Sequence, residues 1–345
     1  MDITLKFQHI RNRIIGKLSL QQKILILFVG ASVFILLLTV FYIGARVKKS
    51  SVENAHVQMG VTADKHAEKI KALLEKELHI TRTLSSAILN HKKLPKEKIF
   101  DIYTSIYKDV LSKNPDVIAV WDSWELKYLD STYQKDFGRY KINVWRESGS
   151  IKSKVDLASI NGDPPQYAKI KKEKNESLEE PYFDTYDNDP NKKILMTSLI
   201  VPNILDNKLV GFVGVDIPLT HYHEIFKQIK PYDGSYAFLL SSTLKYVANP
   251  DKDLIGENAL NEYEDVFLRN GALEKISNGN PAFFEDEDIN GVESYFIIRT
   301  IVVGNCTQRW SMAIVVPKQI IISESVAIFW RTIFIRSEGR RVGKE

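Results

Sequence analysis

The chain has 345 residues, of which 44% are hydrophobic and 26% are charged, a composition that supports two modest hydrophobic cores. The formal net charge is only +4, and no basic stripe interleaved with aromatic residues predicts nucleic-acid binding. A single cysteine, Cys306, excludes an intrachain disulfide and a cysteine-based metal cluster. His221 and His223 do not share a helix face at their spacing, so we predict no metal site and no cofactor.

Residues 24–45 form an uncharged apolar run that is long enough to cross a bilayer. We predict an uncleaved transmembrane helix here. A cleaved signal peptide is the alternative, but signal h-regions are shorter and no clear small-x-small cleavage site follows. Residues 1–23 are rich in lysine and arginine, so the positive-inside rule predicts a cytoplasmic N-terminus. The chain from about residue 47 onward is then expected outside the cytoplasmic membrane.

A second apolar run, residues 320–335, reads as the start of another transmembrane helix. The ten residues that follow, RSEGRRVGKE at 336–345, differ from the rest of the chain. They are one residue away from the translation of a common sequencing-adapter read-through, and we predict a non-native tail. A genuine basic C-terminus is the alternative. If the tail is non-native, the chain is a fragment that lacks the output domain expected after the second membrane helix.

Residues 50–92 predict a long stalk helix. Apolar residues recur at three- and four-residue steps between Ser51 and Asn90, without proline. Such a helix reaches about 60 Å and forms one wall of the domain that it supports. A shorter helix is predicted near Lys96–Ser112.

The rest of the chain predicts two α+β modules in tandem, at residues 93–222 and 223–318. Strands rich in β-branched and aromatic residues come in two sets separated by a helix at about Thr220–Ile229. The absence of regular βαβ alternation predicts antiparallel sheets rather than a parallel-sheet enzyme. The predicted strands are Val117–Trp124, Arg139–Trp145, Ile194–Val201, Leu209–Ile217, Ser235–Ser241, Lys245–Asn249, Glu293–Val303 and Trp310–Val316.

The segment LVGFVGVDIPL, Leu209–Leu219, places the carboxylate of Asp216 at the end of a buried strand. Two interpretations are open. Asp216 accepts hydrogen bonds from main-chain N–H groups in the turn before the next helix, or it faces a cavity in which a ligand cation compensates its charge.

Three segments carry a family resemblance: EEPYFD at Glu179–Asp184, LVGFVGVDIPL, and GSYAFLLSSTLKYVANPDKDLIG at Gly234–Gly256. In this order, between two apolar runs, they resemble the double Cache sensor region of a bacterial transmembrane receptor, most like a methyl-accepting chemotaxis protein. The resemblance covers about residues 20–335. It implies PAS-like modules, a homodimer in the bacterial cytoplasmic (inner) membrane with the sensor region extracytoplasmic, and a small-molecule ligand in the membrane-distal module.

Carried over by position, the resemblance nominates Tyr182, Asp184 and Asp216 for a ligand ammonium, and Tyr167 as the last residue of an Arg-x-Trp-Tyr pattern. Pro164 and Gln166 occupy the arginine and tryptophan positions of that pattern, so the clamp for a ligand carboxylate is missing. An amine, an amino acid or another small solute is therefore the expected ligand class. The candidates to replace the missing clamp are Arg139 and Arg146. The candidate aromatic residues lining the ligand pocket are Trp121, Trp124 and Trp145.

The functional prediction is the sensing region of a transmembrane chemoreceptor that transmits ligand binding through membrane helices. The sensor region of a histidine kinase, cyclase or phosphatase receptor is the alternative. A membrane-anchored extracytoplasmic enzyme is a weaker one, because no G-x-S-x-G motif occurs and no nucleophile lies beside an obvious base. The expected partners are a small solute, the membrane and a second copy of the chain, without nucleic acid.

Overall fold

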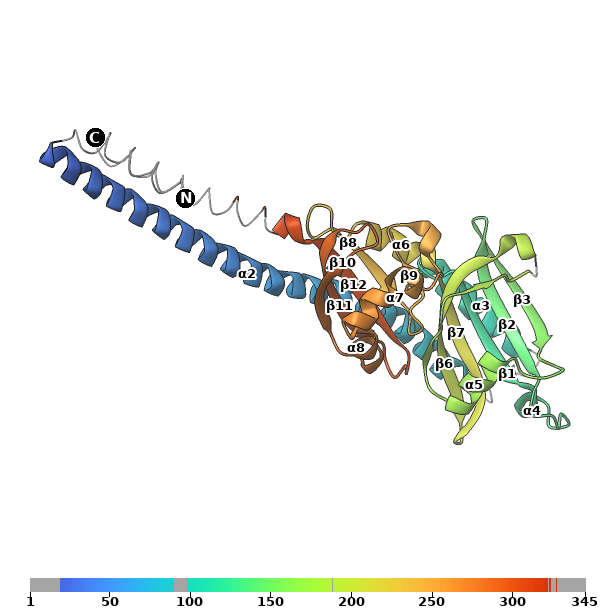
Figure 1. The fold of residues 1–345 in the computed structure, drawn as a ribbon. Helices are drawn as coiled ribbons and strands as arrows, with labels where there is room; N and C mark the ends of the chain where they lie inside the picture. The colour runs from blue at the N-terminus through green and yellow to red at the C-terminus, as the bar shows by residue number, and fades with distance from the viewer. Residues whose placement is uncertain (1–18, 90–97, 188, 322, 324–326, 328–345) are drawn as a thin grey trace. The chain divides into compact units, whose positions relative to one another are not determined.

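The computed structural model describes residues 19–89, 98–187, 189–321, 323 and 327 (Figure 1). The chain divides into two compact units, one of residues 1–57 with 321–345 and the other of residues 58–320. The predicted non-native tail, the segment 1–18 and most of the predicted second membrane helix lie outside the described residues.

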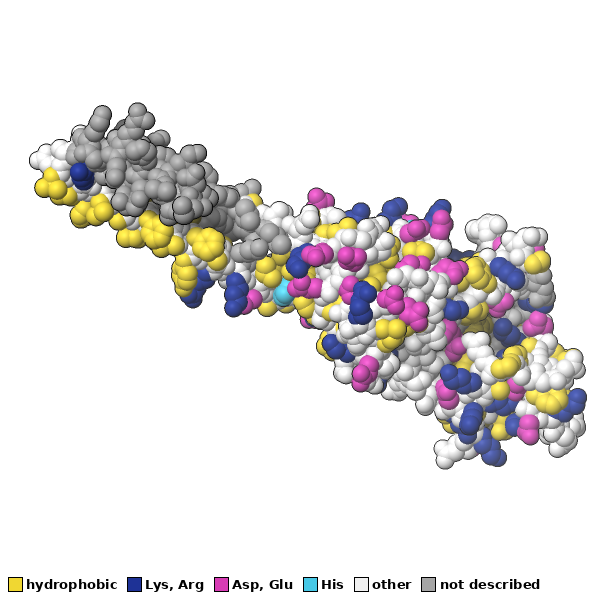
Figure 2. Space-filling view, in the orientation of Figure 1, with side chains coloured by type: hydrophobic (Ala, Val, Ile, Leu, Met, Phe, Trp, Pro, Cys, Tyr) yellow, Lys and Arg dark blue, Asp and Glu magenta, His cyan; other side chains and the backbone are white. Residues whose placement is uncertain are grey.

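The described part of the first unit is the N-terminal portion of helix α2, Leu20–Ile88. Its apolar side chains are exposed, as Phe28 at 70% and Phe41 at 77% illustrate. Figure 2 shows these hydrophobic side chains along the helix. In the described residues, α2 is the one helix long and apolar enough to cross a membrane. The helix predicted at residues 24–45 is therefore present.

In the second unit, the C-terminal portion of α2 has one buried side that packs against the sheets. Helix α3, Ile99–Lys113, packs against strands β1 and β2 of the first sheet, described below, and its Tyr103 and Tyr107 side chains are buried. The hydroxyl of Tyr103 donates to the Ile88 carbonyl at 2.6 Å, which holds α3 to the end of α2. The buried apolar side chains of α2 follow the predicted spacing and are Met59, Ala63, Ala67, Ile70, Leu74, Leu78, Leu84 and Ile88.

The first sheet is antiparallel throughout, with strand order β3-β2-β1-β7-β6-β4 and β5 paired to β6. Two short helices, α4 (Leu126–Leu129) and α5 (Pro165–Glu173), and a 3-10 turn, Pro190–Lys192, connect its strands. The strands are β1 (Ala119–Glu125), β2 (Arg139–Glu147), β3 (Ser150–Ala158), β4 (Ser177–Leu178), β5 (Tyr182–Asp184), β6 (Ile194–Leu205) and β7 (Lys208–Pro218).

The second sheet is also antiparallel, with order β10-β11-β12-β8-β9. Each sheet thus places its first strand between its second and its last strand. Helices α6 (Leu219–Lys227), α7 (Leu260–Arg269) and α8 (Ala272–Asn278) and a 3-10 turn, Lys252–Leu254, complete this region. The strands are β8 (Tyr236–Leu240), β9 (Tyr246–Ala248), β10 (Ala282–Glu287), β11 (Glu293–Val302) and β12 (Arg309–Pro317).

All eight predicted strands are present, with ends shifted by a few residues, and the predicted antiparallel α+β architecture is confirmed. The elements that the sequence prediction missed include β3, β10, α7 and α8. Strand β3 has the sequence SIKSKVDLA, in which polar residues dominate because it lies at an edge of the sheet. Its apolar residues Val155 and Leu157 are exposed, so the usual buried alternation does not mark it.

Candidate functional site

Strand β7 places Asp216 in the middle of the first sheet, where it pairs with Ala119 of β1 and Ser198 of β6. Its side chain is only 3% exposed. Oδ1 accepts hydrogen bonds from Trp121 Nε1 at 2.7 Å and Ser198 Oγ at 2.6 Å, and Oδ2 accepts from the Tyr186 hydroxyl at 2.7 Å. These donors are side chains of neighbouring strands and of the loop after β5, rather than main-chain N–H groups of the turn before α6.

A glycine opposite Trp121 makes the indole contact with Asp216 possible. Gly214 pairs directly with Trp121 across β1 and β7. A Cβ atom at Gly214 would lie 2.2 Å from the Trp121 ring, which is far inside van der Waals contact. Gly214 therefore lets the indole cross β7 and direct its N–H to Asp216.

The segment that follows EEPYFD, Glu179–Asp184, contacts Asp216. The Tyr182 hydroxyl shares a 2.6 Å hydrogen bond with Ser198 Oγ, which itself donates to Asp216. Tyr186 stacks on Trp145 with ring centroids 5.6 Å apart. Sequence reasoning missed Tyr186, although it lies four residues after Tyr182 in the same motif-bearing segment. We call these residues the Asp216 cluster: Trp121, Trp145, Tyr182, Tyr186, Ser198 and Asp216.

A cavity of about 410 Å³ opens beside the Asp216 cluster. Trp145 and Tyr186 line it, so these two stacked rings separate the cavity from the Asp216 carboxylate. Asp184, predicted to face the ligand, is exposed, and its Oδ1 accepts the main-chain N–H of Thr185 at 2.8 Å. The structure thus brings Tyr182, Trp121 and Trp145 together around Asp216, and Asp184 lies exposed outside this group.

The Asp216 cluster is buried, and burial disfavours the charged forms of its ionisable side chains. Burial raises the pKa of Asp216, although the hydrogen bonds from Ser198, Trp121 and Tyr186 partly offset this shift. Burial also lowers the pKa of the nearby Lys141 ammonium, which the Asp216 charge opposes. Burial and the Asp216 charge together raise the pKa of Tyr186, so its hydroxyl stays protonated as a donor.

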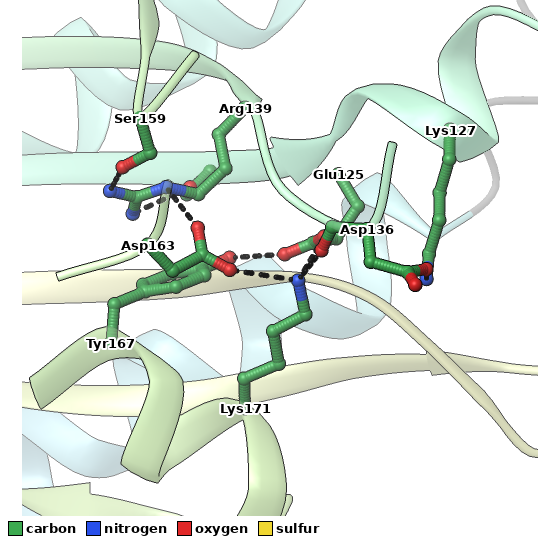
Figure 3. A network of polar contacts seen from close by, with 9 residues as sticks. Glu125, Lys127, Asp136, Arg139, Ser159, Asp163, Tyr167 and Lys171 are labelled. Atoms are coloured by element: carbon green, nitrogen blue, oxygen red, sulfur yellow. Dashed lines mark hydrogen bonds and ion pairs between the residues drawn. The ribbon is translucent and has the colours of Figure 1, made fainter. Parts of the chain in front are cut away.

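Tyr167 belongs to a second polar network on the same face of the sheet (Figure 3). Its hydroxyl donates to Glu125 Oε1 at 2.8 Å, and Lys171 Nζ contacts Glu125 Oε2 at 2.7 Å. Lys171 also reaches Asp163 at 3.0 Å, and the Arg139 guanidinium lies 3.6 Å from the Tyr167 ring centroid. Glu125 is 1% exposed, so this network fastens α5 to the ends of β1 and β2 by buried charges.

The arginines proposed to replace the missing clamp are both engaged elsewhere. Arg139 donates to Ser159 Oγ at 2.6 Å, in the network just described. Arg146 donates to the main-chain carbonyls of Leu111, Asn114 and Val117, at the end of α3 and in the segment before β1. In the described residues, therefore, neither guanidinium is directed at Asp216.

The opposite face of the first sheet carries its own buried carboxyl group. Asp122 is fully buried, and its Oδ2 accepts from the Tyr107 hydroxyl at 2.7 Å and from Trp124 Nε1 at 3.1 Å. Burial raises the pKa of Asp122 to about 7. Trp124 stacks on Tyr103 of α3, with ring centroids 6.2 Å apart, so it is a core residue between sheet and helix.

No family model matches the chain. The chain is 22% identical over 319 residues to the methyl-accepting chemotaxis protein TlpQ of Pseudomonas aeruginosa, in an alignment that covers 83% of this chain and 43% of that protein. The chain thus spans less than half the length of this curated relative.

Several solved structures share the fold. The extracellular domain of the proposed histidine kinase mmHK1S-Z3 matches with a TM-score of 0.65 and 22% identity, over 79% of this chain and 98% of that one. The periplasmic sensory domain of the Campylobacter jejuni chemoreceptor Tlp1 matches with 0.60 and 15%, over 79% and 98%. The ligand-binding domain of the Pseudomonas aeruginosa amino acid chemoreceptor PctB, solved with L-Arg, matches with 0.52 and 17%, over 77% and 97%.

The second unit therefore has the fold of the extracytoplasmic sensor domains of chemoreceptors and histidine kinases. The fold expected from the sequence resemblance is confirmed. The matched parts of the two solved structures are an extracellular domain and a periplasmic sensory domain.

Proposed function

We propose that this chain is the sensing region of a bacterial transmembrane chemoreceptor and that it binds a small solute with a protonated amino group at the Asp216 cluster. The observation that carries the proposal is the buried Asp216 carboxylate. Its hydrogen bonds come from neutral side chains, which stabilise the charge without neutralising it. A ligand ammonium supplies the missing countercharge.

The neighbouring cavity gives the solute its entry. Tyr186 donates to Asp216 from the loop after β5 and lines the 410 Å³ cavity with its ring. A ligand N–H donor takes over the contact of the Tyr186 hydroxyl as the ring moves aside. Trp121 and Trp145 then present aromatic faces to the cation, an arrangement that adds about 0.5–2 kcal/mol.

We infer that signalling uses the C-terminal portion of α2, which packs within the second unit. Arg82 of α2 donates to both carboxylate oxygens of Glu176, at 2.6 and 2.7 Å. Glu176 also accepts the N–H of Asn305, in the β11–β12 turn, at 2.9 Å. Movement of the first sheet around a ligand is thus passed to α2 and the second sheet together. A shift of about 1–2 Å is the usual scale of such changes.

The function is tested by thermal-shift titration of the full chain in detergent with amines, amino acids and carboxylates. At a hundredfold excess over Kd, a true ligand stabilises the folded state by about 2.7 kcal/mol. Asp216→Asn is expected to remove this stabilisation, whereas Asp109→Asn, an exposed aspartate on α3, leaves it intact. Equal protection of wild type and Asp216→Asn by the same solute contradicts the site assignment.

The sensor region of a histidine kinase is the second candidate, because the extracellular domain of mmHK1S-Z3 covers most of this chain at the highest TM-score given above. The full-length gene sequence distinguishes the two. A long coiled-coil hairpin supports the chemoreceptor, and a histidine-bearing dimerisation helix followed by a catalytic domain supports the kinase. In both cases we propose a homodimer in the bacterial inner membrane, anchored by residues 24–45.

A further inference from the structure

A cleft of about 760 Å³ opens beside the second sheet, and none of its described lining residues belongs to the first sheet. It lies between the β8–β9 turn, helix α8 and the start of β12, which contribute Leu244, Ile276 and Arg309. Its volume is in the range of small-molecule sites. Its floor is apolar, because Leu244, Leu260 and Leu273 pack against the hydrophobic core of the second sheet. The cleft therefore offers an apolar surface to a small ligand.

Arg309 carries the one positive charge among the described residues that line this cleft. Its Nη1 donates to the Asn278 carbonyl at 2.7 Å, which holds the guanidinium across the C-terminus of α8. Gly279 makes this position possible, because a Cβ atom there would overlap the guanidinium. A guanidinium has five N–H groups in a planar fork, so Arg309 retains donors for a second acceptor.

Arg309 differs from the other arginines of the second unit, which are bound within the chain. Arg146 donates to main-chain carbonyls, and the rest pair with carboxylates. These pairs are Arg82–Glu176, Arg139–Asp163, Arg269–Asp286 and Arg299–Asp64. Within the described residues, Arg309 forms no ion pair, and it is exposed to solvent on the cleft wall. Its fork is therefore available for a two-point contact with a ligand carboxylate.

The β8–β9 turn, which forms another wall of the cleft, has a constrained conformation. Leu244 has a φ of +64°, in the left-handed region that leucine rarely adopts. Ser242 and Thr243 donate to the two carboxylate oxygens of Glu180, which holds the turn to the segment before β5. Strained residues that the surrounding structure holds in place are common at ligand sites. The strain at Leu244 thus marks this wall of the cleft as a candidate binding surface.

A carboxylate, Glu274, also lines the cleft. It lies in the first turn of α8, whereas Asn278, which holds Arg309, is the last residue of that helix. About one helical turn therefore separates Glu274 from Asn278. Glu274 is exposed, so water weakens its repulsion of an anion bound at Arg309. The arrangement favours a ligand with its anionic group at the Arg309 end and an apolar chain along Leu273.

We propose that this cleft is a second ligand site, which binds a small monocarboxylate with a short apolar chain. The ligand carboxylate accepts hydrogen bonds from the Arg309 guanidinium. The apolar chain covers Leu244, Leu260 and Leu273 and removes their exposed surface from water. The site is separate from the Asp216 cluster and does not depend on the function proposed for that cluster.

The test titrates the full chain in detergent, at constant ionic strength, with acetate, butanoate and 3-methylbutanoate. Butanamide and 3-methylbutanamide are the neutral matches. Binding is measured by calorimetric titration and thermal shift. We expect butanoate or 3-methylbutanoate to bind with a Kd below about 1 mM and at least about tenfold more tightly than its amide. The same probe should bind more tightly than acetate, because acetate lacks the chain that covers the leucines.

Substitutions on the cleft test each part of the proposal. Arg309→Gln is expected to weaken the carboxylate at least about tenfold. Arg269→Gln is the matched control, because it removes the same charge from an arginine that already pairs with Asp286. Leu273→Ala should reduce the advantage of the longer probes over acetate, and Glu274→Gln should bind at least as tightly as the wild type. Circular dichroism establishes that each variant is folded, and Arg309→Met replaces Arg309→Gln if that variant is not.

Asp216→Asn shows which module binds the carboxylate. An unchanged affinity in this variant supports the second site, whereas loss of binding would place the ligand at the first sheet and overturn the inference. The inference is also wrong if no carboxylate binds the wild type with a Kd below about 1 mM, if Arg309→Gln binds as tightly, or if acetate matches the longer probes. These probes carry no amino group, so none of these results bears on the function proposed for the Asp216 cluster, which Asp216→Asn tests with amines.

Discussion

The two sheets place different chemistry at corresponding positions. In the first sheet, Trp121 of β1 pairs with Gly214 of β7, and Asp216 follows two residues later. In the second sheet, Phe238 of β8 pairs with Ala313 of β12, and Val315 follows two residues later. Both sheets thus set a large aromatic residue opposite a small one. The next position on the last strand is a carboxylate in one sheet and a valine in the other.

The surroundings of these positions differ in the same way. Val315 lies in a closed apolar core beneath α7 and α8, whereas Asp216 lies beside a cavity and three polar donors. The same arrangement of strands therefore supports apolar packing in the second sheet and a buried, hydrogen-bonded carboxyl group in the first. The residues of the second core are Phe238, Leu240, Tyr246, Ala259, Tyr263, Val266, Phe267, Ala272, Ile276, Ala282, Phe284, Phe296, Ile298, Ala313 and Val315.

The largest loss of stability is expected when a carboxylate is placed in the second sheet at the position that corresponds to Asp216. Val315→Asp buries a charge among aromatic rings with no built set of donors, and should destabilise the protein by at least about 4 kcal/mol. Thermal unfolding followed by circular dichroism measures it. Val302→Asp, at a residue 43% exposed on β11, should change stability by no more than about 0.5 kcal/mol. If Val315→Asp lowers the free energy of unfolding by much less than this, the second core tolerates a buried carboxylate as the first sheet does.

The next effect concerns the buried charges that fasten α5 to the first sheet. Glu125→Ala leaves Lys171 and the Tyr167 hydroxyl without their shared acceptor and should cost about 3–5 kcal/mol. Glu125→Gln keeps an acceptor for one of them and should cost less. Urea denaturation measures both variants. If Glu125→Ala unfolds at the wild-type midpoint, the network does not stabilise the first module.

A smaller effect is expected at the aromatic–small pair. Gly214→Ala brings a Cβ atom to 2.2 Å from the Trp121 ring, so the indole must move away from Asp216. Overpacking of this kind costs about 1–3 kcal/mol. Quenching and spectral shift of tryptophan fluorescence report the displacement, and ligand protection should fall with it. The matched change in the second sheet, Ala313→Gly, creates space instead of a clash and should leave ligand protection unchanged.

A further effect is a pH dependence that the apolar second sheet lacks at its matching positions. The pKa of Asp122 is raised to about 7, so the folded state binds a proton that the unfolded state releases near pH 4. Stability from this group is fully present below pH 4 and is lost as pH rises toward 7, by up to about 1.4 kcal/mol per pH unit. Asp122→Asn should flatten that slope in denaturation curves between pH 4 and 7. An unchanged slope would assign it to other groups.

The sequence alone predicted a large part of the fold, because local patterns encode it. The apolar residues spaced three and four apart in α2 form its buried side, as predicted. The runs rich in β-branched residues form strands whose ends lie within a few residues of the predicted ones. Strand β3 was not predicted, because an edge strand exposed to water does not need alternating apolar residues. The position of Asp216 on a buried strand was also evident from its apolar neighbours.

The sequence could not say which side chains reach Asp216, since those contacts join residues far apart in the chain. Trp121 and Tyr186 lie 95 and 30 residues from Asp216, and their register and rotamers bring them to it. For the same reason the sequence could not show that Tyr167, predicted beside the ligand, donates its hydroxyl to Glu125, 42 residues away.

The amino-acid pattern by itself thus determined the helices, most of the strands and the family resemblance, because backbone preferences and apolar periodicity act between near neighbours. Tertiary structure decided which buried charges have partners and which do not, because ion pairing depends on distances across the sheet that no local spacing specifies.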